Sequence, residues 1–147
     1  MLTKASFDYA VLRVVPRVER QEFLNIGVIV FCLERRLLEA RVHVDEGRLR
    51  TLWPTLDLET VKHHADGVVR ICAGDETAGP IAKLSQRERF QWLIAPRSTI
   101  IQTSAVHTGI LTEDDSLTDR LERLFEQLVG ITEFKKPPDP WPLLARR

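Results

Sequence analysis

Residues 25–44, NIGVIVFCLERRLLEARVHV, contain two apolar runs separated by the short polar sequence ERR. Runs of this length, rich in β-branched residues, are typical of strands, and the short polar connection favours an antiparallel hairpin. In the second run Ala40 and Val42 alternate with Glu39 and Arg41. Successive side chains of a strand point to opposite faces, so one face of the predicted sheet is core and the other is at least partly hydrated.

A third strand is predicted upstream of this hairpin. Residues 7–15, FDYAVLRVV, are rich in β-branched and aromatic residues and stop at Pro16, as expected for a strand that ends at a proline. Alternation along this run leads us to expect Arg13 to share the less buried face with Arg41 and His43. That face is one place where a ligand or partner can bind.

The rest of the chain predicts helices and one more strand. Apolar residues recur at three-four spacing from Leu58 to Cys72, which predicts an amphipathic helix with Thr55 or Asp57 as N-cap and Gly74 as its stop. Shorter helices are expected at 45–53 and 84–95, a strand at 98–104, and a final helix at 117–128 that is capped by Ser116 or Asp115.

These elements predict an α+β fold. We expect a single domain over residues 1–134, with a mostly antiparallel sheet of about four strands and helices packed on one face. Residues 135–147, KKPPDPWPLLARR, are rich in proline. They are expected to form a tail or arm outside the core, since proline interrupts regular structure.

Composition excludes several classes of protein. A chain of 147 residues with 44% hydrophobic residues suits one ordinary core. Its 21 basic and 21 acidic residues balance, so no global field attracts nucleic acid or an anionic membrane. Cys32 and Cys72 lack the spacing of a metal or redox site and are expected to be buried thiols. The absence of a signal-peptide layout and of a long apolar segment predicts a cytoplasmic protein without a membrane anchor.

The most polar window is residues 87–109, RERFQWLIAPRSTIIQTSAVHTG. After Pro96 it offers a guanidinium, two hydroxyls and several backbone N–H groups, a combination that can hold a phosphate or carboxylate. The candidate ligand- or partner-binding residues of the chain are Arg13, Arg87, Arg89, Arg97, Ser98, Thr99, Gln102 and His107.

Other polar groups have simpler interpretations. His63 and His64 are neighbours on a predicted helix and point in different directions, so we expect no metal site and no cofactor there. His43 and Asp45 have the spacing of an acid and base pair on a strand, but Asp45 is more simply explained as a helix cap. Phosphate-binding, dinucleotide-binding and hydrolase motifs are missing from the sequence. Whether the protein is an enzyme is left open.

Two blocks, FDYAVLRVVPRVERQEFLNIGVIVF near the start and RERFQWLIAPRSTIIQTSAVHTG in the second half, resemble the bacterial family known as domain of unknown function 3037. The resemblance runs from about Tyr9 to Val129. Ala105 departs from it, because proline is expected there. The family has no established activity to carry over, but the resemblance implies a bacterial protein and a frequent neighbourhood with HipA-like serine/threonine kinases. It singles out Tyr9, Arg13, Arg17, Asn25, Asp45, Arg87, Arg89, Arg97, Ser98, Thr99, Gln102 and His107.

Three functions follow as hypotheses. The first is a non-enzymatic regulatory or protein-interaction module, with a HipA-like kinase as the partner suggested by the resemblance and the segment around Trp141 as a docking arm. The second is an enzyme or sensor that binds a nucleotide or another phosphate-bearing small molecule at Arg97. Binding of nucleic acid ranks last, because the net charge is zero.

Overall fold

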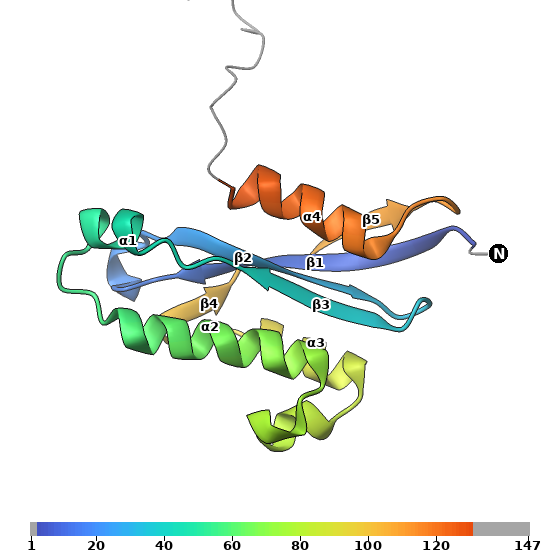
Figure 1. The fold of residues 1–147 in the computed structure, drawn as a ribbon, viewed down its shortest axis with the longest axis horizontal. Coiled ribbons are helices and arrows are strands. Elements are labelled where there is room, and N and C mark those ends of the chain that lie inside the picture. Colours follow the sequence, from blue (N-terminus) through green and yellow to red (C-terminus); the bar gives the residue numbers. More distant parts are fainter. Residues whose placement is uncertain (1–2, 131–147) are drawn as a thin grey trace, which may run out of the picture.

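The structure is a computed structural model that describes residues 3–130. This part of the chain forms one antiparallel sheet with helices on both sides (Figure 1). In chain order the elements are β1 (Ala5–Val14), β2 (Leu24–Cys32), β3 (Leu37–Val42), α1 (Glu46–Leu52), α2 (Leu58–Ala73), α3 (Gln86–Ile94), β4 (Ile101–Thr103), β5 (His107–Leu111) and α4 (Leu117–Leu128).

The sheet is built around β1. The strand order is β3-β2-β1-β4, and β5 also pairs with β1. On the side away from β2, the first half of β1 pairs with β5 and its second half with β4. A bulge interrupts the pairing of β1 with β2 at Leu12 and Arg13, so that Arg13 lies opposite Asn25. The predicted single α+β domain with a mostly antiparallel sheet is confirmed, while β5 lies beyond the strand predicted at 98–104 and was not predicted.

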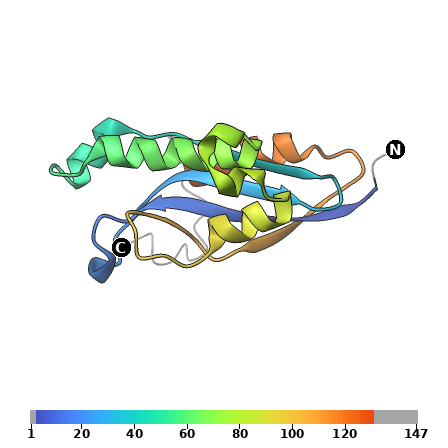
Figure 2. The ribbon, with the colours of Figure 1, turned by 90° about the horizontal axis from the view of Figure 1, so that it is seen from below.

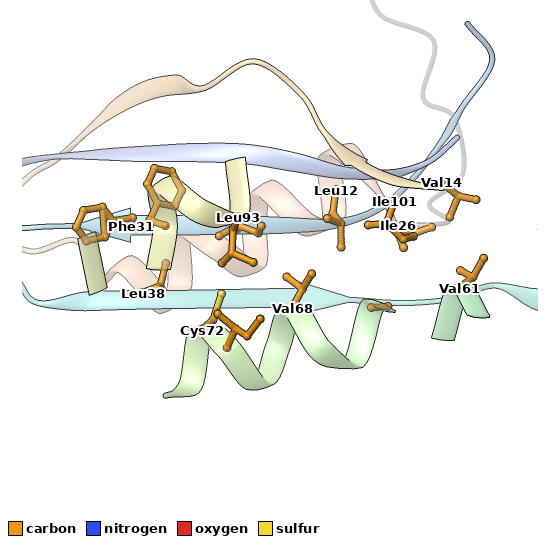
Figure 3. Packing of buried hydrophobic residues seen from close by; sticks show 14 of the residues in the cluster. Leu12, Val14, Ile26, Phe31, Leu38, Val61, Val68, Cys72, Leu93 and Ile101 are labelled. Atoms are coloured by element: carbon orange, nitrogen blue, oxygen red, sulfur yellow. The ribbon is translucent and has the colours of Figure 1, made fainter. Parts of the chain in front are cut away.

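One face of the sheet, which we call the α2 face, is covered by α2 and α3 (Figures 1 and 2). Alternate residues of the three long strands supply its sheet side, and the apolar stripe of α2 supplies the other. Figure 3 shows Leu12, Val14, Ile26, Phe31, Leu38, Val61, Val68, Cys72, Leu93 and Ile101 in this core. Burial of apolar side chains at these positions is the main stabilising contribution to the fold.

The opposite face, the α4 face, has a second core. Val28, Val30 and Cys32 of β2 pack there against Leu121 and Phe125 of α4. The prediction that all helices pack on one face is therefore wrong for α4. The reason lies in β2, whose sequence is apolar at nearly every position and so needs cover on both sides.

The polar positions of β3 do not prevent α4 from packing on this face. Arg41 pairs with Glu122 and lies over the Phe125 ring, and Glu39 accepts a hydrogen bond from Thr118 Oγ1 at 2.9 Å. The face that was expected to be hydrated is thus partly covered by α4, while Arg41 at its edge and His43 beyond the strand stay exposed.

Helix ends follow the sequence signals. Asp57 caps α2 by accepting the N–H of Thr60, and Gly74 ends it with a φ of 74°, a conformation that glycine adopts without strain. Ser116 caps α4 in the same way as Asp57 caps α2. Within residues 3–130 no helix is both long and apolar enough to cross a membrane. The predicted tail, residues 135–147, lies outside the described residues.

Candidate functional site

The predicted site residues fall in three separate places. Arg13, Gln102 and His107 lie on the α4 face of β1 and its neighbours. Arg97, Ser98 and Thr99 lie at the corner between α3 and β4. Arg87 and Arg89 lie on α3 itself. The structure therefore divides the polar window into several environments, each of which has its own chemistry.

The first environment is the part of the α4 face that α4 leaves uncovered. Helix α4 packs on β2 and β3, and on the same face of β1 the side chains of Tyr9 and Arg13 are only half-buried, while Val11 between them is buried. Tyr9 lies directly opposite His107 and stacks on it with a ring-centroid distance of 5.3 Å. Arg13 lies directly opposite Gln102. We call the surface formed by Tyr9, Arg13, Asn25, Gln102 and His107 the open face.

Arg13 is the charged centre of the open face. Its guanidinium lies over the Phe23 ring at 4.0 Å from the centroid, a cation–π contact. It forms no ion pair within residues 3–130, and its Nε atom is buried without a hydrogen-bond partner among them. A half-buried cation of this kind lacks the compensation that charged groups normally find inside a protein.

Asn25, on the neighbouring strand, has an unpaired hydrogen-bond acceptor. Its Nδ2 donates to the carbonyl of Leu128 at 3.3 Å, but its buried Oδ1 has no partner among residues 3–130. Since Asn25 lies opposite Arg13 across the β1–β2 pair, an unpaired donor and an unpaired acceptor lie next to each other. Buried polar groups without partners are rare, and each of them costs free energy in the folded protein.

Ser104 lies between the end of β4 and the start of β5 and bonds this connection to β1. Val11 donates its N–H to Ser104 Oγ at 2.8 Å, and Ser104 donates its N–H to Val11 O at 2.8 Å. The serine side chain thereby replaces a missing strand partner. This holds β4 and β5 in line along β1, which places Gln102 and His107 on the same face.

The second environment is the corner beside Arg97. A cavity of about 310 Å³ is lined by residues of α2, α3 and β4 that include His63, His64, Trp92, Arg97 and Thr99. The Arg97 guanidinium lies 4.0 Å above the Trp92 ring centroid and also donates to the Trp92 carbonyl. Partial burial lowers the pKa of Arg97, but an arginine still carries its charge at neutral pH.

Only some of the groups after Pro96 that were expected to hold a phosphate or carboxylate lie together at this corner. Thr99 uses its hydroxyl to donate to the carbonyl of Ile101 at 2.7 Å, and Gln102 Nε2 donates to Thr99 O at 3.0 Å. Ser98 is exposed and does not line the cavity. His63 and His64 are exposed on α2 and line the same cavity as Arg97.

Arg89 has a structural role, because its guanidinium bonds backbone carbonyls at the junction of α2 with α3. It is only 8% exposed, and its guanidinium donates to Ile71 O at 2.7 Å, Cys72 O at 2.9 Å and Leu84 O at 3.0 Å. Two of these carbonyls lie in the last turn of α2, where helical N–H donors run out, although Ile71 O also accepts the N–H of Gly74 at 3.1 Å. We therefore assign Arg89 to the junction of α2 with α3, which differs from its predicted part in ligand binding.

Arg87, two residues earlier, is exposed on another side of α3. It lines a cavity of about 510 Å³ on the α2 face together with Asp8, Leu33, Phe90 and Val106. No ion pair to Arg87 exists within the described residues. Asp8 and Glu34 place two carboxylates on the same cavity.

Asp45 and the two cysteines have structural positions and do not form a site. Asp45 Oδ1 accepts the N–H of Arg48 at 3.1 Å and caps α1, which confirms the simpler of the two interpretations. Cys32 and Cys72 are free and buried, and burial raises the pKa of the Cys72 thiol to about 12. Within residues 3–130 no three acidic, histidine or cysteine side chains come together in a way that could hold a metal ion.

Sequence reasoning named most of the open face but could not assemble it. Tyr9 and Asn25 entered only through the family resemblance, and Phe23 was missed. The available signal was strand alternation, which places Tyr9 and Arg13 on one side of β1. The position of Asn25 could not be obtained in this way, because the bulge shifts the register of β2 at that point.

Comparison with known proteins identifies a family. The family model described as protein of unknown function (DUF3037) matches residues 9–129. The chain therefore belongs to this family. Neither a search of curated proteins nor a search of solved structures gave a match.

Proposed function

We propose that this member of the DUF3037 family is a non-enzymatic protein-interaction module that binds a partner through the open face. One observation carries the proposal: Arg13 is a half-buried cation without an acidic partner in the described residues, and it lies beside the unpaired Oδ1 of Asn25. The two unpaired atoms are themselves buried, so a partner would bond the terminal amino groups of the half-buried Arg13 guanidinium, which make no hydrogen bond to the described residues.

The chemistry favours an acidic group at the centre of the partner's surface. A guanidinium binds a carboxylate with two parallel hydrogen bonds, and such charge-assisted bonds are stronger than neutral ones. The flat Tyr9–His107 stack and the Phe23 ring lie on either side along the strand. Aromatic residues and arginine are the residue types enriched at the energetic centres of protein interfaces.

The kind of partner is suggested by the family resemblance, which points to HipA-like serine/threonine kinases. The non-enzymatic part of the proposal is supported by the histidines. His107 is stacked on Tyr9, and the carboxylate nearest in sequence to His43 is committed to the cap of α1. A histidine that works as a general base is normally oriented by a third group.

Titration calorimetry with a HipA-like kinase from the same organism tests the proposal. The variants Arg13→Met and His107→Ala should each weaken the complex by about tenfold or more, which corresponds to about 1.4 kcal/mol. Arg50→Ala removes an exposed arginine on α1 and is the matched control that should bind as the wild type does. Equal binding by all four proteins would exclude the open face as the interface.

A second candidate function is binding of a phosphate-bearing small molecule at the Arg97 corner. The observation in its favour is that a cation and two imidazoles, Arg97 with His63 and His64, line one cavity of about 310 Å³. That volume is near the lower end of the range for small-molecule sites. A thermal-shift titration with nucleotides and phosphorylated metabolites, repeated on Arg97→Ala, tests it. A shift of several degrees that is lost in the variant would favour this function.

A further inference from the structure

Strand β5 has an unpaired edge. On one side it pairs with β1, and on the other side no strand of residues 3–130 follows it. The hydrogen bonds made by the loops, turns and caps of this part of the chain include none to the backbone of Thr108 or Ile110. An open edge of this kind presents a row of backbone donors and acceptors to other chains.

The hydrogen-bond pattern shows which groups this edge presents. Val11 and Val15 of β1 direct their N–H groups toward Ser104 Oγ and Ile100 O, on the side of β4. Backbone groups alternate in direction along a strand, so Phe7 and Tyr9, also odd-numbered, bond toward β5. Gly109 and His107 are their direct partners. The N–H and C=O groups of Thr108 and Ile110 therefore point to the open edge.

This edge also lacks the usual protection. Its sequence, HTGIL, has no lysine, acidic residue or proline, which are the residues that normally prevent edge strands from pairing with other chains. Two apolar side chains beside it are exposed instead, Val106 by 39% and Ile110 by 55%. The opposite edge of the sheet, β3, carries Glu39 and Arg41.

We propose that β5 pairs antiparallel with β5 of a second copy of the chain, about a two-fold axis that passes beside Thr108. In this register Thr108 lies opposite Thr108 of the second copy, and Val106 lies opposite its Ile110. Thr108 and Ile110 present their backbone groups to the edge, and pairing would extend the strand by one residue to Val106, so that each opposed pair can exchange both of its hydrogen bonds. The interface is the same on both copies, as two-fold symmetry requires.

Side-chain matching favours this register over its nearest alternative. Centring the axis on Gly109 would place Ile110 opposite Thr108, an apolar residue against a polar one. The register centred on Thr108 instead forms two Val–Ile pairs. Directly opposed β-branched pairs stabilise a sheet more than mismatched ones. Val106, Thr108 and Ile110 share a face because alternate residues of a strand do.

The dimer would leave the open face accessible. Tyr9 and His107 lie on the α4 face, whereas the paired apolar side chains lie on the α2 face, where Val106 lines the 510 Å³ cavity. Two copies would therefore present two open faces on one continuous sheet. The dimer does not depend on the proposed partner, and either one can fail without the other.

Light scattering coupled to size-exclusion chromatography of the full chain gives the first test. The wild type should have twice the monomer mass of 16.9 kDa at micromolar concentration. Ile110→Lys should raise the dissociation constant of the dimer at least about tenfold, because it places a charge at the edge. Leu52→Lys is the matched control, since Leu52 on α1 is 53% exposed. A monomeric wild type, or an Ile110→Lys dimer as tight as the wild type, would overturn the proposal.

Oxidative cross-linking gives a second test that does not depend on the folding of Ile110→Lys. Hydrogen-bonded antiparallel pairs have Cα atoms about 5.5 Å apart, within the range a disulfide spans. Thr108→Cys should therefore form a covalent dimer, and Thr55→Cys, at an exposed position before α2, should not. The native cysteines are buried and free and should not contribute. Equal cross-linking of both variants, or of neither, would contradict the register.

Discussion

Arg89 at the α2–α3 junction and Arg13 on the open face differ in how many hydrogen bonds their guanidinium groups make. Arg89 donates to three backbone carbonyls, whereas Arg13 has a buried Nε without a partner and no ion pair in the described residues. A buried polar group that is fully bonded holds a fold together, while one that is left unpaired costs free energy. The difference separates a structural arginine from one that is available to a partner.

The largest expected effect on the free energy of unfolding is at Arg89, whose guanidinium bonds three carbonyls. Arg89→Met roughly keeps the length of the side chain but leaves the carbonyls of Cys72 and Leu84 without their side-chain donor and removes one of the two donors to Ile71 O. We expect a loss of about 2–4 kcal/mol in the free energy of unfolding, measured by urea denaturation. Arg87→Met, two residues away and exposed, is the control and should change it by less than about 0.5 kcal/mol. Equal losses in both variants would remove the distinction.

At the open face the same substitution should have a much smaller effect on stability. Arg13→Met removes a donor that has no acceptor, together with a cation–π contact to Phe23. Because these contributions oppose each other, the free energy of unfolding should change by less than about 1 kcal/mol in either direction. A loss above about 2 kcal/mol in urea denaturation would mean that Arg13 has a structural role as Arg89 does.

The smallest expected effect concerns an exposed carboxylate at the α2–α3 junction. Hydrogen bonds from Thr77, followed by one from Arg70, lower the pKa of Asp75 from 3.8 to about 2. A carboxyl with a lowered pKa in the folded state stabilises the fold above its ordinary pKa, and this contribution is lost as the pH falls through the lowered value.

Asp75→Asn should accordingly lower the urea midpoint slightly at neutral pH, since exposed ion pairs contribute little. The difference from the wild type should shrink between pH 4 and pH 2, the window set by these two pKa values. Urea titrations across this range measure it. A difference that stays constant with pH would show that the carboxylate charge is not what stabilises the junction.

The sequence was most informative where structure is local. The β-branched runs predicted β1, β2 and β3, and the caps Asp57 and Ser116 and the stop at Gly74 stand where the helices begin and end. Each of these signals depends on residues close together in the chain.

What could not be predicted depends on contacts between distant segments. Placement of α4 on the other face follows from the apolar side of β2, which had been assigned to a single core. Arg87 and Arg89 are equivalent in composition, and only the position of the α2 C-terminus beside α3 distinguishes them. The juxtaposition of Arg13 with Asn25 depends on a bulge in β2, and the adjacent Gly27, a residue type that often marks a bulge inside a strand, was not interpreted in this way.

The central claim is that a partner binds at Arg13 on the open face, and nuclear magnetic resonance of the Arg13 Nε–H group tests it most directly. On titration with a HipA-like kinase, this signal and those of Gln102 and His107 should move together, because a partner carboxylate bound to the Arg13 guanidinium would change the surroundings of its Nε–H group. The Trp92 indole signal beside Arg97 should stay in place. Movement at Trp92 with an unchanged Arg13 signal would contradict the account and transfer the binding site to the Arg97 corner.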